Sequence, residues 1–308
     1  MYDSVRAAFL PFSEPLEARV HFMYLDVKSL VSTGVGNLLD ADDSERFGTN
    51  PNPLPDIFTL GWFDKDTSVP AGRDEIEDEY RKVKFSGTNL APLGQKQQIT
   101  RLRISDDDID TLVTGKLDSF EGTLKGRPPF AAFDDWPADG QLGLLSMAWA
   151  LGPLFDFPKF QAAAAQSDWS TMARECRMTE AGNPGVIPRN VRNALLFTLA
   201  GWTSAEGGDP TPLVYDPARK LDANMRSGVF PVPLELLVGV QAALETLGCD
   251  PGGLDGVIGP GTRSALTSFQ TSAGLARTPG VRSVDDIPSD TLSALAAGLD
   301  DKGVRHLP

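Results

Sequence analysis

The chain of 308 residues carries 42 acidic and 28 basic side chains, which give a formal net charge of -14 at pH 7. This charge repels nucleic-acid backbones and anionic membrane surfaces, and it therefore excludes both as expected partners. A hydrophobic content of 41% is typical of globular proteins, and the length suffices for two domains.

The first residues, MYDSVRAAFLPFSEP, contain one arginine, a short apolar run interrupted by proline and no small-residue cleavage site. They predict no Sec signal. The longest apolar stretches, such as LGLLSMAWALGPLF, are broken by glycine and proline well before the ~20 residues that a membrane span needs. No membrane insertion is expected.

Side chains able to hold a metal are scarce. The sequence has two histidines, His21 and His306, and two cysteines, Cys176 and Cys249, and these provide no zinc-ligand constellation. The cysteines fall in different predicted domains, so free thiols are favoured over a disulfide. Neither a metal nor a cofactor is expected.

Residues 17–37, EARVHFMYLDVKSLVSTGVGN, predict a helix end, a strand, a turn around Lys28-Ser29 and a second strand. Glycoside hydrolysis needs one protonated and one ionised carboxyl group, which act on opposite faces of the sugar. Glu17 and Asp26 are candidates for this pair. Strand alternation places Ser32 on the side of Asp26, where a hydroxyl can hold the attacking water. The alternative for an isolated pair is a surface glutamate and a turn aspartate.

The wider pattern is Glu-x8-Asp-x5-hydroxyl-x-Gly-x-Gly, with a tyrosine two residues before the aspartate. It resembles the phage-type lysozymes of glycoside hydrolase family 24. The resemblance implies cleavage of the bond between N-acetylmuramic acid and N-acetylglucosamine, with inversion. It also implies Glu17 as general acid, Asp26 as second carboxylate, and Ser32 or Thr33 as the residue that holds the water.

The sequence departs from this family at two positions of the segment. The family usually has threonine where this chain has Ser32, and histidine where it has Asn37. Thr33 takes the role of the hydroxyl if the hairpin register shifts by one residue. Tyr24 and Asn37 are the residues of this segment expected to contact the substrate.

Residues 40–135 are much longer than the corresponding part of compact family members and form an insertion-like region. They contain two acidic runs, DEIEDE (74–79) and DDDID (106–110). Short helices and loops are expected here, because no long apolar run of period two is present. Neither run has the spacing of a calcium loop, so both are interpreted as solvated helix faces or caps.

Residues 137–202 have the periodicity of a helical core. The segments DWSTMARECRM and NPGVIPRNVRNALLF resemble the late helices of the same lysozyme family. Arg189 is therefore expected to be structural or to line the substrate cleft, and the alternative is a solvated helix face. The proline- and glycine-rich residues 204–233 predict a linker, so that the catalytic domain spans 1–203.

Residues 234–308 predict a domain of three short helices, and apolar spacing assigns a set of residues to its core: Leu237, Val240, Leu244, Ile258, Leu266, Phe269, Leu292 and Leu295. The run VQAALETLGCDPGGLDGVIGPGTRSALTSFQTSAGL resembles a peptidoglycan-binding module found beside many wall hydrolases. In this module Asp255, Gly256, Thr262 and Gln270 are candidates for wall binding. The first three also have a local role, because the glycine permits a tight loop and Thr262 caps the next helix.

Together these patterns predict an α+β fold, mainly α, in which a lysozyme-like domain with a small β-hairpin precedes a three-helix bundle. The predicted function is that of a monomeric muramidase that binds peptidoglycan and is made in the cytoplasm without a Sec signal. Its place of action is the periplasm or the cell wall. A phage endolysin and a type VI interbacterial effector fit equally, the latter with an immunity protein or a secretion-machine component as partner. The alternatives are a non-catalytic wall-binding protein and a lytic transglycosylase.

Overall fold

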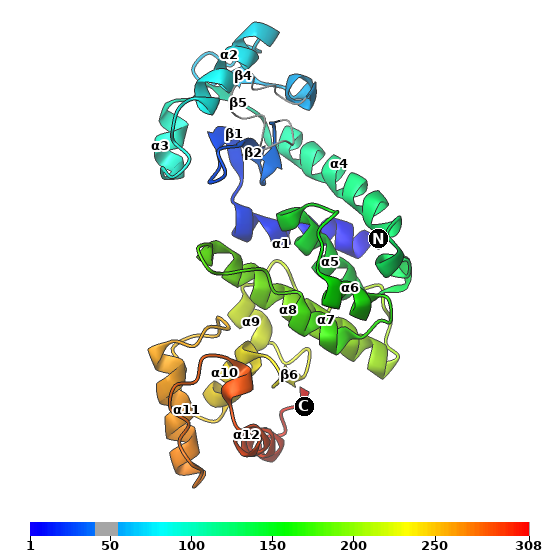
Figure 1. The fold of residues 1–308 in the computed structure, drawn as a ribbon, viewed down its shortest axis with the longest axis vertical. Helices are drawn as coiled ribbons and strands as arrows, with labels where there is room; N and C mark the ends of the chain where they lie inside the picture. Colours follow the sequence, from blue (N-terminus) through cyan, green and yellow to red (C-terminus); the bar gives the residue numbers. More distant parts are fainter. Residues whose placement is uncertain (41–54, 308) are drawn as a thin grey trace. The chain divides into compact units, whose positions relative to one another are not determined.

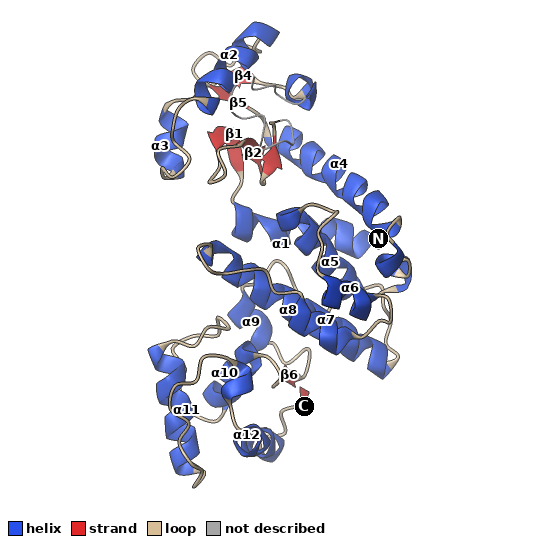
Figure 2. Ribbon diagram, in the orientation of Figure 1, coloured by secondary structure: helices blue, strands red, loops and turns tan. Residues whose placement is uncertain are grey.

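The computed structural model describes residues 1–40 and 55–307, and these form many helices and a few small sheets (Figures 1 and 2). This confirms the predicted fold class, α+β and mainly α. Part of the insertion-like region, residues 41–54, lies outside the described residues. The helices are α1 (Asp3–Glu17), α2 (Arg73–Lys84), α3 (Leu93–Gln98), α4 (Asp106–Lys125), α5 (Ala138–Leu151), α6 (Pro158–Ala164), α7 (Trp169–Glu175), α8 (Ile187–Glu206), α9 (Leu221–Met225), α10 (Leu237–Thr246), α11 (Pro260–Ser272) and α12 (Ser289–Asp301).

The strands are short, and they are β1 (Val20–Leu25), β2 (Val31–Gly34), β3 (Asn37–Leu38), β4 (Phe63–Asp64), β5 (Leu102–Arg103), β6 (Val232–Pro233) and β7 (His306–Leu307). Two compact units divide the chain. One is Leu10–Ser119, and the other joins Met1–Phe9 to Phe120–Pro308. Each unit is described separately below.

In the unit Leu10–Ser119, strands β1, β2 and β3 form an antiparallel sheet in this order. Tyr24 pairs with Ser32, and Thr33 pairs with Asn37. The predicted helix end and hairpin are therefore present: α1 ends at Glu17, and the first turn spans the residues between β1 and β2.

The insertion-like region of this unit contains α2, α3 and the two-stranded β4–β5 ladder, in line with the expected short elements. Glu79, the last residue of the first acidic run, differs from the expected solvated face. Its carboxylate is buried and accepts the backbone N–H groups of Arg101 and Leu102 at 2.8 and 2.7 Å. A buried carboxylate needs such partners, so Glu79 fastens β5 to α2.

A second buried carboxylate, Asp40, binds the sheet and helix α2. Its Oδ2 accepts the N–H of Val31 at 2.6 Å and pairs with the Lys84 ammonium at 2.8 Å, and its Oδ1 accepts the Tyr80 hydroxyl. Both members of the ion pair are almost completely buried. Because each buried charge is neutralised by the other, this network ties α2 to β2.

The second acidic run holds β1 against the first turns of α4. The Arg19 guanidinium donates to Asp106 and Asp110 at 2.6 and 2.7 Å, and the His21 ring lies 3.0 Å from Asp106. Ser105 caps the helix, because its Oγ accepts the N–H of Asp108 at 3.1 Å, and the Asp108 carboxylate in turn accepts the N–H of Ser105 at 3.1 Å. These aspartates therefore act as caps and surface ion pairs.

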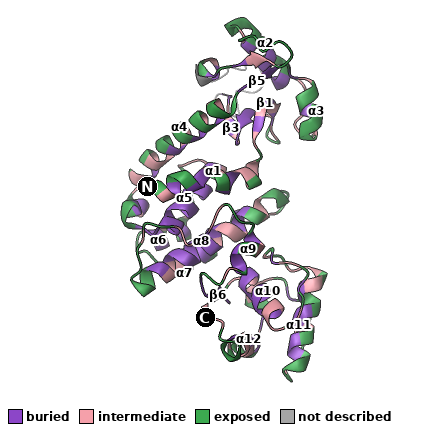
Figure 3. Ribbon diagram, turned by 180° about the vertical axis from the view of Figure 1, so that it is seen from behind, coloured by how far each residue is buried: buried purple, intermediate pink, exposed green. Residues whose placement is uncertain are grey.

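In the other unit, α5 is buried at residues 138–149 and is largely purple in Figure 3, and it packs against α8, which is buried at residues 195–200. Their close approach requires glycine. A Cβ atom on Gly143 would lie 3.0 Å from the Phe197 ring, and one on Gly201 would lie 2.9 Å from Trp169. These contacts pack α5 and α7 tightly against α8.

Residues 204–233, the predicted linker, are held by hydrogen bonds. The fully buried carboxylate of Asp139, at the start of α5, accepts the N–H groups of Val214 and Tyr215 at 2.9 Å each. Burial raises the pKa of Asp139 to about 7, although both hydrogen bonds oppose the rise. The segment also contains α9, in which the Arg226 C-cap binds Glu245 of α10 at 2.8 and 2.9 Å.

The C-terminal helices α10, α11 and α12 enclose a small core, with the parallel pair β6–β7 beside it (Figure 1). Five of the predicted core residues are buried: Val240, Leu244, Leu266, Phe269 and Leu295. Leu237, Ile258 and Leu292 are only half-buried and line a groove instead. Across residues 1–40 and 55–307, every helix falls short of the length and apolarity that a bilayer span demands.

Candidate functional site

The two candidate acids flank one tyrosine of the hairpin unit. Glu17 is the last residue of α1, and the positive φ of Ala18 (62°) turns the chain into β1. Asp26 follows β1 directly, two residues beyond Tyr24. Burial raises the pKa of Tyr24, and the negative charges of Glu17 and Asp26 raise it further. Both carboxylates therefore act on the same phenol group.

Asp26 is fixed by the turn that it begins. Its Oδ1 accepts the N–H groups of Lys28 and Leu30 at 2.8 Å each, and its own N–H donates to the Leu30 carbonyl. Among the described residues, Oδ2 accepts no hydrogen bond. One oxygen thus orients the carboxylate, while the other is available to a ligand or a water molecule.

The two neighbouring hydroxyls of β2 have different surroundings. Ser32 lies opposite Tyr24 in the ladder. Thr33 is fully buried, and its Oγ1 lies 3.2 Å from each of the Val20 and Phe22 carbonyl oxygens of β1. Ser32 therefore shares a face with the tyrosine, whereas Thr33 is engaged with the backbone of the sheet.

Asn37 closes the turn between β2 and β3. Its Oδ1 accepts the N–H of Val35 at 3.1 Å, and a Cβ atom on Gly34 would lie only 2.9 Å from this oxygen. Gly34 also has a positive φ of 61°, a backbone conformation that favours glycine. Asn37 is buried, so its amide oxygen serves the turn, and a contact with substrate stays a prediction.

Two lysines complete the cluster and were not anticipated from the sequence. Lys116 of α4 donates to the Gly36 carbonyl at 3.2 Å; burial lowers its pKa to about 8, and the charge of Glu17 opposes this shift. Lys96 of α3 lies 5.7 Å from the centroid of the Tyr24 ring and donates to the Asn89 carbonyl at 3.1 Å. Burial lowers its pKa as well, and Asp26 opposes that shift. Each acid therefore has a lysine within electrostatic range.

The cluster of Glu17, Tyr24, Asp26, Ser32, Lys96 and Lys116 has the features of a site for acid–base chemistry on a neutral substrate. Lys96 lies over the Tyr24 ring, Lys116 binds the turn between β2 and β3, and the charges of Glu17 and Asp26 act on Tyr24. In the part of the chain that the structure describes, no three His, Cys, Asp or Glu side chains are grouped as metal ligands. Proton transfer by carboxyl groups is the chemistry that this set supports.

Arg189 belongs to the other unit and is buried in α8, so it is not a solvated surface residue. Its Nη1 lies 3.2 Å from the carbonyl oxygen and 3.1 Å from the Oγ of Ser146 on α5. These bonds give Arg189 a structural part in joining the two helices. A role at the substrate stays a prediction.

In the C-terminal module, the buried Gln241 organises the loop that carries three of the predicted binding residues. Its Nε2 donates to Asp255, at 2.9 Å, and to Thr262, at 3.1 Å, while its Oε1 accepts the N–H of Gly256 at 2.8 Å. Gly256 has a φ of 72°. Asp255, Gly256 and Thr262 therefore set the shape of this loop, and their contact with the wall stays a prediction.

Gln270 plays a similar part on α11. It is fully buried, and its Nε2 donates to the hydroxyls of Thr278 and Thr291 at 2.8 and 3.1 Å. The glutamine thus joins α11 to the start of α12 and to the loop between them. Both cysteines of the chain are free, and burial raises the pKa of the Cys176 thiol to about 12, which keeps it unreactive.

Comparison with known proteins identifies one part of the chain. Residues 235–281, which include α10 and α11, match the peptidoglycan binding domain family. No curated protein matches the sequence. The predicted wall-binding module is therefore confirmed, and peptidoglycan of the bacterial cell wall is the partner that this module indicates.

Proposed function

We propose that the protein is a peptidoglycan hydrolase of the muramidase type, which cleaves the β-1,4 bond between N-acetylmuramic acid and N-acetylglucosamine. The observation that carries the proposal is that Glu17 ends the helix before β1, that Asp26 follows β1 with its Oδ1 fixed by two backbone N–H groups, and that Ser32 lies opposite Tyr24. A wall-binding module in the same chain supplies the substrate class.

In the proposed reaction, Glu17 donates a proton to the glycosidic oxygen as the sugar acquires oxocarbenium character. Asp26, oriented through Oδ1, stabilises this charge and accepts the proton of the water that attacks the opposite face, with inversion. Ser32 holds this water together with Asp26. Thr33 is less suited to the task, because its hydroxyl is engaged with two carbonyl groups.

The lysines have electrostatic roles in this proposal. Lys116 lies within electrostatic range of Glu17, and burial lowers the pKa of this lysine to about 8, so its positive charge near the acid is lost at more alkaline pH. Lys96 lies within electrostatic range of Asp26, whose charge opposes the lowering of the Lys96 pKa by burial. The insertion-like region, which contributes Lys96 through α3, thus takes part in the site.

The biological setting that we propose is the degradation of a bacterial wall, by a phage endolysin or by an effector delivered into a rival cell. The protein would be made in the cytoplasm and would act, as a monomer, in the periplasm or on the wall. An immunity protein or a secretion-machine component is the further partner in the second setting.

Hydrolysis of purified peptidoglycan by the Glu17→Gln variant tests the proposal. Activity should fall about 10²–10⁴-fold, because the general acid is lost. Glu77→Gln is the matched control, since Glu77 forms only a surface pair with Arg81. Equal activity of Glu17→Gln and the wild type contradicts the assignment of the acid.

Mass analysis of the released sugars separates the alternatives. A reducing N-acetylmuramic acid end indicates hydrolysis, and an anhydro end indicates a lytic transglycosylase, which needs only one acid. Binding of peptidoglycan without release of sugars indicates a non-catalytic wall-binding protein.

A further inference from the structure

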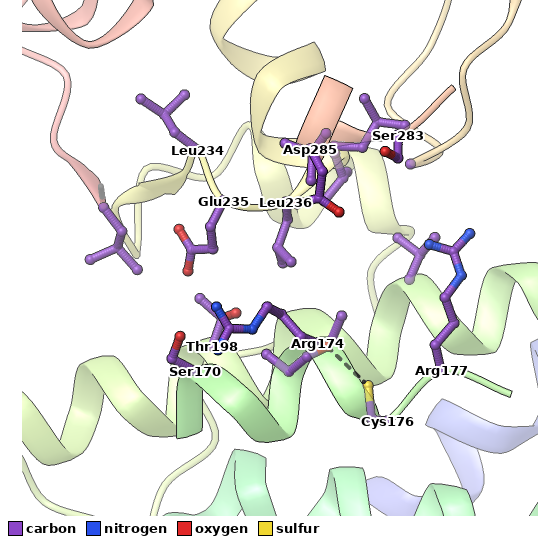
Figure 4. A pocket seen from close by; sticks show the side chains of 18 of the residues that line it. Ser170, Arg174, Cys176, Arg177, Thr198, Leu234, Glu235, Leu236, Ser283 and Asp285 are labelled. Atoms are coloured by element: carbon purple, nitrogen blue, oxygen red, sulfur yellow. Dashed lines mark hydrogen bonds between the residues drawn. The ribbon is translucent and has the colours of Figure 1, made fainter. Parts of the chain in front are cut away.

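A groove of about 1590 Å³ lies within the unit that joins Met1–Phe9 to Phe120–Pro308. Helices α7 and α8 form one wall, and the C-terminal module forms the other through residues that include 234–238 and 256–258 (Figure 4). The two walls are in contact, because a Cβ atom on Gly256 would lie 2.6 Å from Cγ2 of Val191 on α8. The peptidoglycan-binding module therefore shares its groove with the helical core.

Polar side chains from three segments converge in this groove. Ser170 and Arg174 extend from α7, Thr198 lies on α8, and the Glu235 carboxylate points toward them from the module (Figure 4). The Thr198 hydroxyl is buried and has no hydrogen-bond partner among the described residues, whereas Glu235 is exposed. These groups offer both donors and acceptors of hydrogen bonds at one place.

The balance of charge argues against an anionic ligand. The lining contains six carboxylates but only four guanidinium groups: Asp168, Glu175, Glu180, Glu206, Glu235 and Asp285 against Arg174, Arg177, Arg263 and Arg282. Free carboxylates of a peptide stem would be repelled by this excess of negative charge. An uncharged ligand with many hydroxyl and amide groups meets no such repulsion.

The apolar part of the lining fits sugar rings. The half-buried indole of Trp202 belongs to the lining, and indole faces pack against the apolar faces of sugars. Leu237, Ile258 and Leu292, which helical periodicity assigns to the core of the module, are also partly accessible there. Mixed-sign polar groups beside aromatic and aliphatic surface match an N-acetylated glycan.

We propose that this groove is a second glycan-binding site, which takes the uncharged N-acetyl sugar backbone of peptidoglycan and not its peptide stem. The inference rests on the wall association of the module and not on hydrolysis by Glu17. A strand held in the groove would remain attached while other strands are cleaved, so the site would retain the protein on its polymer.

Hydrogen–deuterium exchange of the full chain tests the proposal and locates the ligand. The Glu17→Gln variant prevents cleavage, and the probe is the β-1,4-linked hexamer of N-acetylglucosamine. Backbone amides of residues 234–238 and 282–288, which lie in loops or at helix starts beside the groove, should exchange several-fold more slowly with the hexamer bound. A free stem peptide at the same concentration should have no effect on them.

Substitutions in the same background test the named contacts. Arg174→Ala and Glu235→Ala should each raise the Kd for the hexamer about tenfold, because a hydrogen bond to a charged group is lost. The Kd is measured from the protection of residues 234–238. Arg219→Ala is the matched control, since Arg219 is also an exposed arginine but lies outside the groove. The Arg219→Ala variant should bind the hexamer with the same Kd as the Glu17→Gln protein that carries no further substitution.

The possible results separate this inference from the proposed hydrolysis. If the hexamer slows the exchange of residues 234–238 and 282–288 but not that of residues 17–37, the result supports the glycan site and argues against the proposed active site. The reverse pattern overturns the glycan site alone. Protection of the groove segments only by the stem peptide, or by neither probe, also overturns it.

Discussion

Tyr24 and Ser32 face each other across the β1–β2 ladder as partners in its register. The next residue, Thr33, has its hydroxyl directed at the backbone of β1. Neighbouring strand residues point to opposite faces of a sheet, so only one of the two hydroxyls can lie on the face of Tyr24. The register that the structure adopts gives this place to Ser32.

Ser32→Ala should reduce hydrolysis of peptidoglycan at least about tenfold, because the water loses one of its hydrogen-bond partners. Thr33→Val should instead lower the free energy of unfolding by about 1–2 kcal/mol, since both buried carbonyl contacts are lost. Initial rates and thermal unfolding of both variants provide the measurements. If Thr33→Val, at a temperature where it is folded, loses more activity than Ser32→Ala, then Thr33 holds the water.

Lys116→Met should remove a change in kcat/KM that the wild type shows near pH 8. Burial lowers the pKa of Lys116 to about 8, so the cation within electrostatic range of Glu17 loses its charge there, and methionine has no such proton to lose. The profile of kcat/KM against pH is the measurement. The control is Lys82→Met, because Lys82 is an exposed lysine on α2. An unchanged profile would show that Lys116 has no influence on the acid.

Asp139→Asn should flatten the dependence of stability on pH between about pH 4 and pH 7. Burial raises the pKa of Asp139 to about 7, so in this window the folded chain holds a proton that the unfolded chain releases. The free energy of unfolding therefore falls as pH rises, by at most about 4 kcal/mol for a shift of this size.

Thermal unfolding, followed by tryptophan fluorescence at several pH values, measures this effect. The exposed Asp156 gives the control variant Asp156→Asn, which should retain the slope of the wild type. The predicted sign is contradicted if the free energy of unfolding of the wild type rises from pH 4 to pH 7 and this rise is absent in Asp139→Asn.

Gln241→Leu should abolish retention on insoluble peptidoglycan while leaving the fold of the hairpin unit intact. The glutamine makes several hydrogen bonds within the loop of Asp255–Thr262, and an apolar replacement leaves those partners unsatisfied. A cosedimentation assay gives the bound fraction. Gln97→Leu, on the exposed surface of α3, is the control and should sediment like the wild type. Full retention of Gln241→Leu would show that loop shape does not govern wall binding.

The sequence predicts those parts of the candidate site whose determinants are local. The helix end at Glu17, the turn after Asp26 and the glycine turn at Gly34 depend on neighbouring residues, so their patterns are visible in one short segment. The lysines are different. Lys116 reaches Gly36 from 80 residues away, and neither its spacing nor its surroundings mark it as part of a site.

Tertiary packing also determines which residues are buried, and a periodic sequence pattern does not show this. Glu79 occupies an acidic run that predicts a solvated face, yet it is buried because β5 presents two amides to it. Conversely, Leu237 and Leu292 have the spacing of core residues but line a groove. Apolar periodicity identifies the face that is withdrawn from water, but it does not distinguish a core from a ligand-binding surface.

The attachment of α9 to the module sets where this protein can be divided for use in chimeras. Asn224 binds the backbone of Asp216 through both its amide oxygen and its amide nitrogen, at 2.9 and 2.8 Å, and Arg226 pairs with Glu245. A graft that starts at residue 234 severs these bonds. A junction between Tyr215 and Asp216 transfers them whole, and so carries an intact wall anchor to another enzyme.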